Sequence, residues 1–192
     1  MKTTHDSGTV VICRDKSSLN VKKTNSYLNR RLKVKYYLKE REWPYKGVKP
    51  RIIVEKLLGN EDEDLMDYKF YCFNGDPRLM FVVSNRWGDG GHRADYYNME
   101  GENIAITQPG YNSSPVPPSL PSVFNEMKEL AQQLSKGMPH IRVDFYYTGG
   151  QIYVGELTFF DSGGYLTFIP KEYNRILGDW IDLSIVHKTD RG

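Results

Sequence analysis

The chain has 192 residues, and its 26 Lys and Arg against 24 Asp and Glu give a formal net charge of +2. This length suffices for one core or two small lobes but is short for several independent domains, and the balanced charge gives no support for a nucleic-acid partner. No apolar run approaches the roughly 20 residues that span a bilayer, and the polar first residues are unlike a secretory signal, so we expect a cytoplasmic protein without a membrane span.

The first 64 residues predict a helix and two strands between loops. Apolar residues recur at three- and four-residue steps among many Lys and Arg, as in an amphipathic helix, and the flanking apolar runs are rich in Val and Ile, as in strands. In chain order the predicted elements are a glycine loop over 2–8, a strand over 9–14, a helix over 17–42, a strand over 51–58 and an acidic loop over 59–64.

The remaining residues predict mostly antiparallel strands. Asn-Gly-Asp-Pro at 74–77 and Thr-Gly-Gly at 148–150 are turn sequences, and each lies between two runs of β-branched and aromatic residues, as in a hairpin. The predicted strands are 67–73, 79–84, 93–97, 141–147 and 151–160, and the predicted helices are 122–136 and 171–183. This order of elements is typical of the mixed α+β class.

The last predicted hairpin carries the most informative residues. Because side chains alternate along a strand, Arg142 and Asp144 share one face of its first strand. Glu156 and Thr158 share a face of its second strand for the same reason. An odd turn centred on Gly150 sets Asp144 opposite Glu156, whereas an even turn sets them on opposite faces. The double glycine permits the odd, bulged turn.

Two carboxylates on one sheet face repel each other unless a cation lies between them. Mg²⁺ prefers such oxygen ligands together with phosphate oxygens, and Arg142 beside them is suited to hold an anionic intermediate. Asp144 and Glu156 are therefore candidate metal ligands. The same spacing fits equally well a solvent-facing pair of strands decorated with charges.

Two further segments carry candidate nucleotide contacts. In the opening loop, backbone N–H groups around Ser7 and Gly8 can cradle phosphate, with Lys2 as a point charge, although any turn of Ser and Gly near a terminus has this pattern. Further along, Asp67 and Lys69 share a strand face, where a carboxylate suits ribose hydroxyls and an ammonium suits phosphate. An exposed ion pair explains the same spacing.

Taken in this order, the segments resemble the TupA-like ATP-grasp family over nearly the whole chain. The motifs that carry the resemblance are KxxHxSG in the opening loop, VEKLL at 54–58, DYKFYCFNGDP at 67–77, RVDFYY at 142–147, GELTF at 155–159 and LGDW at 177–180. Their order and spacing carry more weight than any one motif. The chain has no GxSxG, Walker A or HExxH sequence, so acyl-serine, P-loop and zincin mechanisms lose their main support.

The resemblance implies an ATP-grasp fold, in which two α+β lobes with mostly antiparallel sheets enclose a nucleotide cleft. The small lobe is expected over about 1–58 and the large lobe over about 59–192. It also implies a ligase that uses ATP and Mg²⁺, or Mn²⁺, to phosphorylate a carboxylate to an acyl phosphate, which an amine attacks to form an amide. Such proteins carry a further amino-terminal domain, so we expect a fragment with weak or absent turnover.

Carried over residue by residue, the resemblance assigns a role to each candidate. Lys2 and Lys69 contact phosphates beside Ser7 and Gly8, the backbone of Glu55, Lys56 and Leu58 forms the adenine hinge, Asp67 binds ribose, Asp144 and Glu156 ligate the metal, and Arg142 stabilises the acyl phosphate. Thr158 stands where many ATP-grasp enzymes have an Asn ligand. The candidate substrate contacts, with a surface loop and a strand edge as the alternative, are His92, Arg93, Tyr96 and Tyr97.

By the same resemblance the substrates are an amino acid and a uronic-acid glycan of a cell-surface polysaccharide or teichuronopeptide, which is an inference by analogy. The alternatives are a non-catalytic, nucleotide-binding scaffold for polysaccharide assembly and a glycosyltransferase-like protein, for which residues 61–64 come nearest to a DxD metal motif. Convergence of Arg142, Asp144 and Glu156 with Lys69 on a cleft is expected of the ligase.

Overall fold

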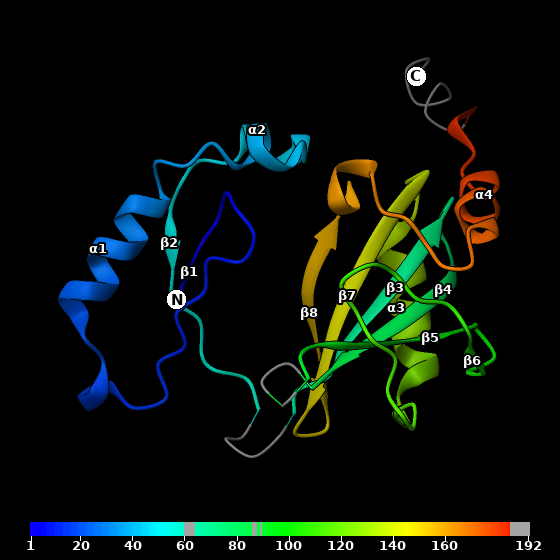
Figure 1. Ribbon diagram of the computed structural model, residues 1–192, viewed down its shortest axis with the longest axis horizontal. Helices are drawn as coiled ribbons and strands as arrows, with labels where there is room; N and C mark the ends of the chain where they lie inside the picture. Colours follow the sequence, from blue (N-terminus) through cyan, green and yellow to red (C-terminus); the bar gives the residue numbers. More distant parts are fainter. Residues whose placement is uncertain (60–63, 86–87, 89, 185–192) are drawn as a thin grey trace. The chain divides into compact units, whose positions relative to one another are not determined.

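The structure is a computed structural model that describes residues 1–59, 64–85, 88 and 90–184 (Figure 1). Its packing divides the chain into two compact units. Unit 1 comprises Met1–Leu58 and Phe160–Tyr165, and unit 2 comprises Gly59–Phe159 and Leu166–Gly192. In the described part of the chain, no helix is both long and apolar enough to cross a membrane.

Unit 1 consists of short helical segments and a two-stranded ladder. The helical segments are η1 (Lys16–Ser18), α1 (Val21–Arg31), α2 (Tyr36–Glu40), η2 (Trp43–Gly47) and η3 (Asp161–Gly164), and the strands are β1 (Lys2–Thr3) and β2 (Ile52–Ile53). The strands pair antiparallel, with Lys2 opposite Ile53. The single helix predicted over 17–42 is therefore wrong in extent, because that region forms three separate helical segments.

Local backbone features account for the start of α1 and the end of α2. The side chain of Asn20 accepts a hydrogen bond from the Lys23 amide at 2.9 Å, which caps the first turn of α1 and fixes its start. Arg41, which follows α2, has a φ of 62°. That left-handed conformation cannot continue a right-handed helix, so α2 ends there.

The two strands predicted in this region are also wrong in extent. Of residues 9–14, Val10 forms one isolated bridge with Lys2. Of residues 51–58, only Ile52–Ile53 are in a strand, because β1 offers just two residues to pair with. Val54, directly after β2, is 74% exposed. The prediction assumed that the apolar residues of these runs point into a core at every second position, and the exposure of Val54 shows that they do not.

Unit 2 is built on a six-stranded antiparallel sheet with the strand order β6-β5-β4-β3-β7-β8. Its strands are β3 (Asp67–Phe73), β4 (Asp76–Ser84), β5 (Arg93–Tyr97), β6 (Asn103–Ile104), β7 (His140–Thr148) and β8 (Gln151–Thr158), and its helices are α3 (Phe124–Ser135) and α4 (Glu172–Asp179). These bounds confirm both predicted hairpins, the strand at 93–97 and both helices, with shifts of a few residues at their ends. The mixed α+β class is confirmed.

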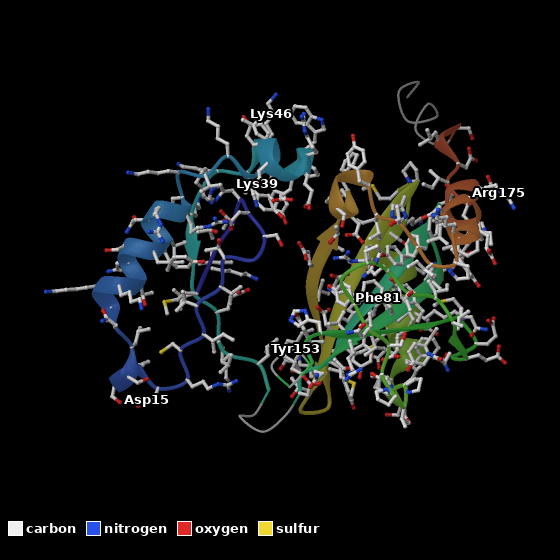
Figure 2. All side chains as sticks on the ribbon, viewed as in Figure 1. Asp15, Lys39, Lys46, Phe81, Tyr153 and Arg175 are labelled. Atoms are coloured by element: carbon white, nitrogen blue, oxygen red, sulfur yellow. The ribbon has the colours of Figure 1, made fainter. Side chains whose placement is uncertain are left out.

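The two faces of this sheet bury different side chains. Alternation along β3 directs Phe70 to one face, where Met127 of α3 packs in the same apolar cluster. Tyr71 points to the other face and joins Phe81 in a second cluster, to which α4 contributes. Figure 2 shows Phe81 within the packed side chains of the sheet, whereas Arg175 of α4, with 76% of its side chain exposed, points to solvent. The sheet is thus covered by α3 on one face and partly by α4 on the other.

The turn between β7 and β8 has an even number of residues. Thr148 pairs with Gln151, which leaves Gly149 and Gly150 as the turn, and both glycines have positive φ. Two residues with positive φ are typical of the tight type I′ turn, which matches the twist of the flanking strands. Of the two turns that the sequence left open, the structure therefore has the even one.

A β-bulge at Gly155 nevertheless sets Asp144 opposite Glu156. Without it, the register set by the turn would place Glu156 opposite Val143, on the face that α3 covers. One extra residue in a strand reverses the facing of every residue beyond it. A Cβ added at Gly155 would lie 2.7 Å from Cε2 of Tyr146, so the packing here leaves no room for a side chain.

Replacing Gly155 by Ala should therefore destabilise the hairpin. We expect Gly155→Ala to lower the free energy of unfolding by about 1–3 kcal/mol, because the added methyl must displace the ring of Tyr146. Urea denaturation followed by circular dichroism measures this. The control is Gly178→Ala in α4, where nothing lies within 4 Å of the added Cβ and Ala is the better helix former. Equal stability of the two variants would contradict the prediction.

Candidate active site

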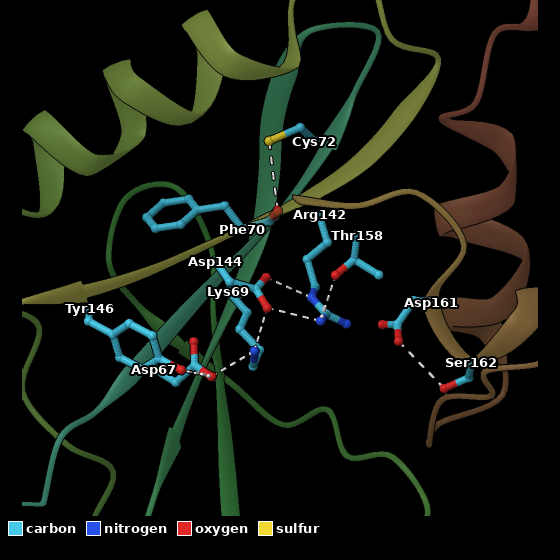
Figure 3. Close-up of polar contacts among 10 residues, drawn as sticks. All are labelled: Asp67, Lys69, Phe70, Cys72, Arg142, Asp144, Tyr146, Thr158, Asp161 and Ser162. Carbon is cyan, nitrogen blue, oxygen red and sulfur yellow. Dashed lines mark hydrogen bonds and ion pairs between the residues drawn. The ribbon is translucent and has the colours of Figure 1, made fainter. Parts of the chain in front are cut away.

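Polar and charged side chains form one row across three neighbouring strands of the sheet, on the face opposite α3 (Figure 3). In register, Lys69 lies opposite Asp144, which lies opposite Glu156. The row consists of Asp67 and Lys69 from β3, Arg142 and Asp144 from β7, and Glu156 and Thr158 from β8. The structure therefore brings together all six candidates predicted on these strands.

Asp144 is the centre of the row and is 1% exposed. Its Oδ1 accepts a hydrogen bond from Nε of Arg142 at 2.8 Å, and its Oδ2 accepts from Nη2 of Arg142 at 2.9 Å and from Nζ of Lys69 at 2.5 Å. Nη2 of Arg142 also donates to Oγ1 of Thr158 at 3.0 Å. A buried carboxylate is tolerated when it is paired and hydrogen-bonded, and here a bidentate guanidinium and an ammonium meet that requirement.

Lys69 lies between two carboxylates. Its Nζ is 2.7 Å from Oδ2 of Asp67 and 2.5 Å from Oδ2 of Asp144, and its side chain is 12% exposed. Burial acts to lower the pKa of Lys69, but the charges of Asp67 and Asp144 outweigh burial and raise that pKa above its usual value. The hydroxyl of Tyr146 donates to Asp67 at 3.4 Å. Lys69 is therefore an ammonium at neutral pH and joins β3 to β7.

The row offers oxygen ligands suited to Mg²⁺ held together with phosphate. Among the residues that the structure describes, no group of three or more His, Cys, Asp and Glu side chains is arranged to hold a metal. Mg²⁺ does not require one, since proteins usually bind it through one or two carboxylates and substrate phosphates. Asp144 and Glu156, in register and flanked by the Thr158 hydroxyl, provide that smaller set. They fit a shared metal site and do not fit an all-protein cage.

The candidates of the opening loop lie in unit 1. Ser7 and Gly8 are exposed, and Gly8 has a φ of 80°, a left-handed conformation that glycine adopts without steric cost. Nζ of Lys2 is 3.0 Å from Oε2 of Glu55, and the two side chains are 39% and 56% exposed. Such an exposed pair contributes little to stability, so the Lys2 ammonium can readily leave Glu55 and pair with another anion.

The predicted adenine hinge, Glu55 to Leu58, follows β2 and lies outside any strand. Glu55 and Lys56 are exposed and Leu58 is half-buried. Their backbone groups are thus not committed to a sheet ladder, and an adenine ring needs such groups as hydrogen-bond partners. The hinge role of these residues stays a prediction.

Sequence reasoning missed a buried acid inside the opening loop. Asp6 accepts hydrogen bonds from the hydroxyls of Thr3 and Thr9, and its side chain is 0% exposed. Arg31 of α1 donates to Oδ2 of Asp6 from Nη2 at 2.7 Å and from Nε at 3.1 Å. The one signal in the sequence is a Thr three residues away on either side, while Arg31 meets Asp6 only in the fold. Asp6 ties the glycine loop to α1.

The four candidate substrate contacts do not lie together. Tyr96 is 0% exposed and Tyr97 is 3% exposed, and they belong to the apolar clusters on opposite faces of the sheet. The Tyr97 hydroxyl donates to the carbonyl of Pro118 at 2.5 Å. Both tyrosines are core residues, so we withdraw them as substrate contacts. His92 is exposed, and Nη1 of Arg93 donates to a backbone carbonyl at 2.9 Å.

Neutralising Asp6 should loosen the glycine loop. We expect Asp6→Asn to lower the free energy of unfolding by about 1.5–3 kcal/mol, because hydrogen bonds to a charged, buried group are lost. Burial acts to raise the pKa of Asp6, but the hydrogen bonds from Thr3, Thr9 and Arg31 together with the Arg31 charge hold that pKa below its usual value of 3.8. The carboxylate therefore adds stability above pH 3.8 that is lost as pH falls through the lowered pKa.

Urea denaturation at several pH values checks this prediction. The wild-type chain should lose stability below about pH 4 more steeply than Asp6→Asn does. Asp15→Asn is the matched control, because Asp15 is an exposed acid of the same unit, and it should cost less at neutral pH. The same loss of stability in both variants would argue against a special role for Asp6.

Comparison with known proteins gives one match. The sequence profile of the TupA-like ATPgrasp family matches residues 1–182. This stretch includes the glycine loop of unit 1, the row on β3, β7 and β8, and helix α4. No curated protein and no solved structure matches the chain. The match therefore covers both units and nearly the whole length of the sequence.

Proposed function

This chain belongs to the TupA-like ATP-grasp family, and from that premise we propose that it is a carboxylate–amine ligase that forms an amide through an acyl phosphate. Membership of the family implies an enzyme of the ATP-dependent ligase type, and ATP-grasp proteins generally use ATP and Mg²⁺. The acyl phosphate, the assignment of single residues and the substrates belong to our proposal.

The observation that carries the proposal is the joining of Lys69, Arg142 and Asp144 on one sheet face with Glu156 in register beside them. Phosphoryl transfer requires positioning and neutralisation of charge more than a nucleophile on the protein. The two cations suit phosphate and acyl phosphate oxygens, and the two carboxylates suit a divalent cation. When bound, Mg²⁺ supplies further neutralisation of the phosphates.

We assign the following roles to the residues of the chain. Lys2, Ser7, Gly8 and Lys69 contact phosphates, Glu55, Lys56 and Leu58 form the adenine hinge, Asp67 binds ribose, Asp144 and Glu156 are the metal ligands, and Arg142 stabilises the acyl phosphate. The hydrogen bond from Arg142 to Thr158 adds a role for that hydroxyl, which is to orient the guanidinium. Asp6 positions the glycine loop through Arg31.

The substrates that we propose are an amino acid and a uronic-acid carboxylate of a cell-surface polysaccharide, as in teichuronopeptide synthesis. Support for this step comes from the family alone. His92 and Arg93 remain the candidate substrate contacts, because they are not buried in the core as the neighbouring tyrosines are. An arginine suits a carboxylate substrate, since its planar donors match two carboxylate oxygens.

The alternatives receive less support. A scaffold without turnover does not require Lys69, Arg142 and Asp144 to be joined in a buried network, so their convergence favours the ligase. A glycosyltransferase proper would require a metal motif at 61–64, of which residues 61–63 lie outside the described residues. The carboxylate of Asp64 accepts a hydrogen bond from the Asn85 amide at 2.5 Å, which engages it with the residue that follows β4.

A thermal-shift titration with ATP and Mg²⁺ tests the proposed site. A ligand that binds the folded chain at about 100 times its Kd adds about 2.7 kcal/mol of stability, so the melting temperature of the wild-type chain should rise when both are added. Glu156→Gln keeps the size of the side chain but removes a metal ligand. We expect this variant to lose most of the rise that depends on Mg²⁺.

The control is Glu129→Gln. Glu129 is an exposed residue of α3, and α3 packs on the other face of the sheet. It should respond like the wild-type chain. Release of ADP on adding a carboxylate and an amine then tests turnover itself. A wild-type chain that shows no rise with ATP and Mg²⁺ would count against the ligase, whereas a rise without release of ADP would favour the nucleotide-binding scaffold.

A further inference from the structure

Positive and negative side chains do not balance in the row on β3, β7 and β8. Asp67, Asp144 and Glu156 are three acids, and Lys69 and Arg142 are two cations, so the formal charge is −1. Asp144 is 1% exposed, and both cations hydrogen-bond directly to its carboxylate. A divalent ion bound to Asp144 would therefore lie beside two fixed positive charges.

This arrangement opposes the binding of a bare divalent ion. Charges a few ångströms apart interact several times more strongly in a partly buried place than in water, and a double charge doubles the repulsion. The row by itself has a net charge of only −1 with which to attract the divalent ion. The phosphates of a nucleotide carry several negative charges and would offset both Lys69 and Arg142.

We propose that Lys69 makes divalent-metal binding at Asp144 and Glu156 conditional on a nucleotide phosphate. Its ammonium satisfies Asp144 and repels a bare metal ion, and phosphate oxygens reverse that balance. The inference rests on the proposed function, because it requires the nucleotide to bind at this row. Lys69 then sets the order in which the ligands bind, in addition to contacting phosphate.

A purely structural role for Lys69 is the alternative, and it predicts something different. Lys69 joins Asp67 of β3 to Asp144 of β7, so a structural tie predicts that its removal weakens the fold and every ligand site. The proposal predicts that its removal strengthens metal binding in the absence of nucleotide. A gain of affinity is not the result of general damage.

The test measures Mn²⁺ binding by electron paramagnetic resonance on the full chain, with and without a non-hydrolysable ATP analogue, and subtracts the Mn²⁺ held by free nucleotide. In the wild-type chain the analogue should tighten Mn²⁺ binding by about tenfold or more. Without nucleotide, Lys69→Met should bind Mn²⁺ at least about tenfold more tightly than the wild-type chain does. The coupling between nucleotide and metal should shrink by the same factor, because coupling is reciprocal.

Two control variants accompany the test. Lys69→Arg keeps a positive charge beside Asp144 and should therefore gain no affinity for Mn²⁺ in the absence of nucleotide. Lys136→Met removes a positive charge from an exposed position after α3 and should leave Mn²⁺ binding unchanged. If Lys69→Met does not fold, Lys69→Gln is a second neutral variant, and the wild-type comparison with and without the analogue stands on its own.

Three outcomes count against the proposal. If the wild-type chain binds Mn²⁺ equally well with and without bound analogue, metal binding is not conditional. If Lys69→Met gains no affinity for Mn²⁺ without nucleotide, Lys69 is not the cause. In both cases the nucleotide still binds, so the proposed ligase survives. If the analogue does not bind the wild-type chain at all, the proposed function fails and this inference fails with it.

Discussion

The β-bulge at Gly155 is the constraint on which the candidate active site depends. The tight turn at the tip of the β7–β8 hairpin sets a register that alone would direct Glu156 toward α3. The bulge reverses the facing of the last residues of β8, so both Glu156 and Thr158 lie on the side of Asp144. A glycine is required there because the ring of Tyr146 occupies the space of a side chain. Bulges are common beside active sites for this reason.

The network on that face also explains how the sheet tolerates charge near its centre. β3 is an inner strand, and six of its seven residues are buried, Lys69 being the half-buried one. Charges in such a place are costly unless each has a partner. Because Lys69, Arg142 and Asp144 satisfy one another, removal of one member exposes the others to that cost. The same completeness means that a ligand of Asp144 would have to replace Lys69 or Arg142 as its partner.

The sequence predicted the strands of unit 2 well because long apolar and β-branched runs carry a clear period of two. It left open whether Asp144 and Glu156 share a face, because an odd turn would place them together and an even turn would place them apart. The turn is even, and the bulge that brings them together lies at Gly155 in GELTF, where the glycine gave no sign of its role. The length of the ladder in unit 1 was overestimated because Val54 and the residues after it have the composition of a strand but no strand in the described part of the chain pairs with them.

The Asp6–Arg31 pair depends on two residues that meet only in the fold. Tyr96 and Tyr97 were misjudged because an aromatic beside a loop does not reveal whether it is buried.

Net charge was a poor guide to the ligand because it averages two unlike parts. Of the 26 Lys and Arg, 15 lie in residues 1–58 with only 5 of the 24 Asp and Glu, which leaves 11 and 19 for the remainder. The first part is therefore strongly cationic, and one of its few acids, Asp6, is wholly buried. The charge of this part therefore favours an anion, whereas residues 59–192 carry 19 acids against 11 cations. The total of +2 conceals this division, because the excess of cations in the first part and the excess of acids in the second nearly cancel.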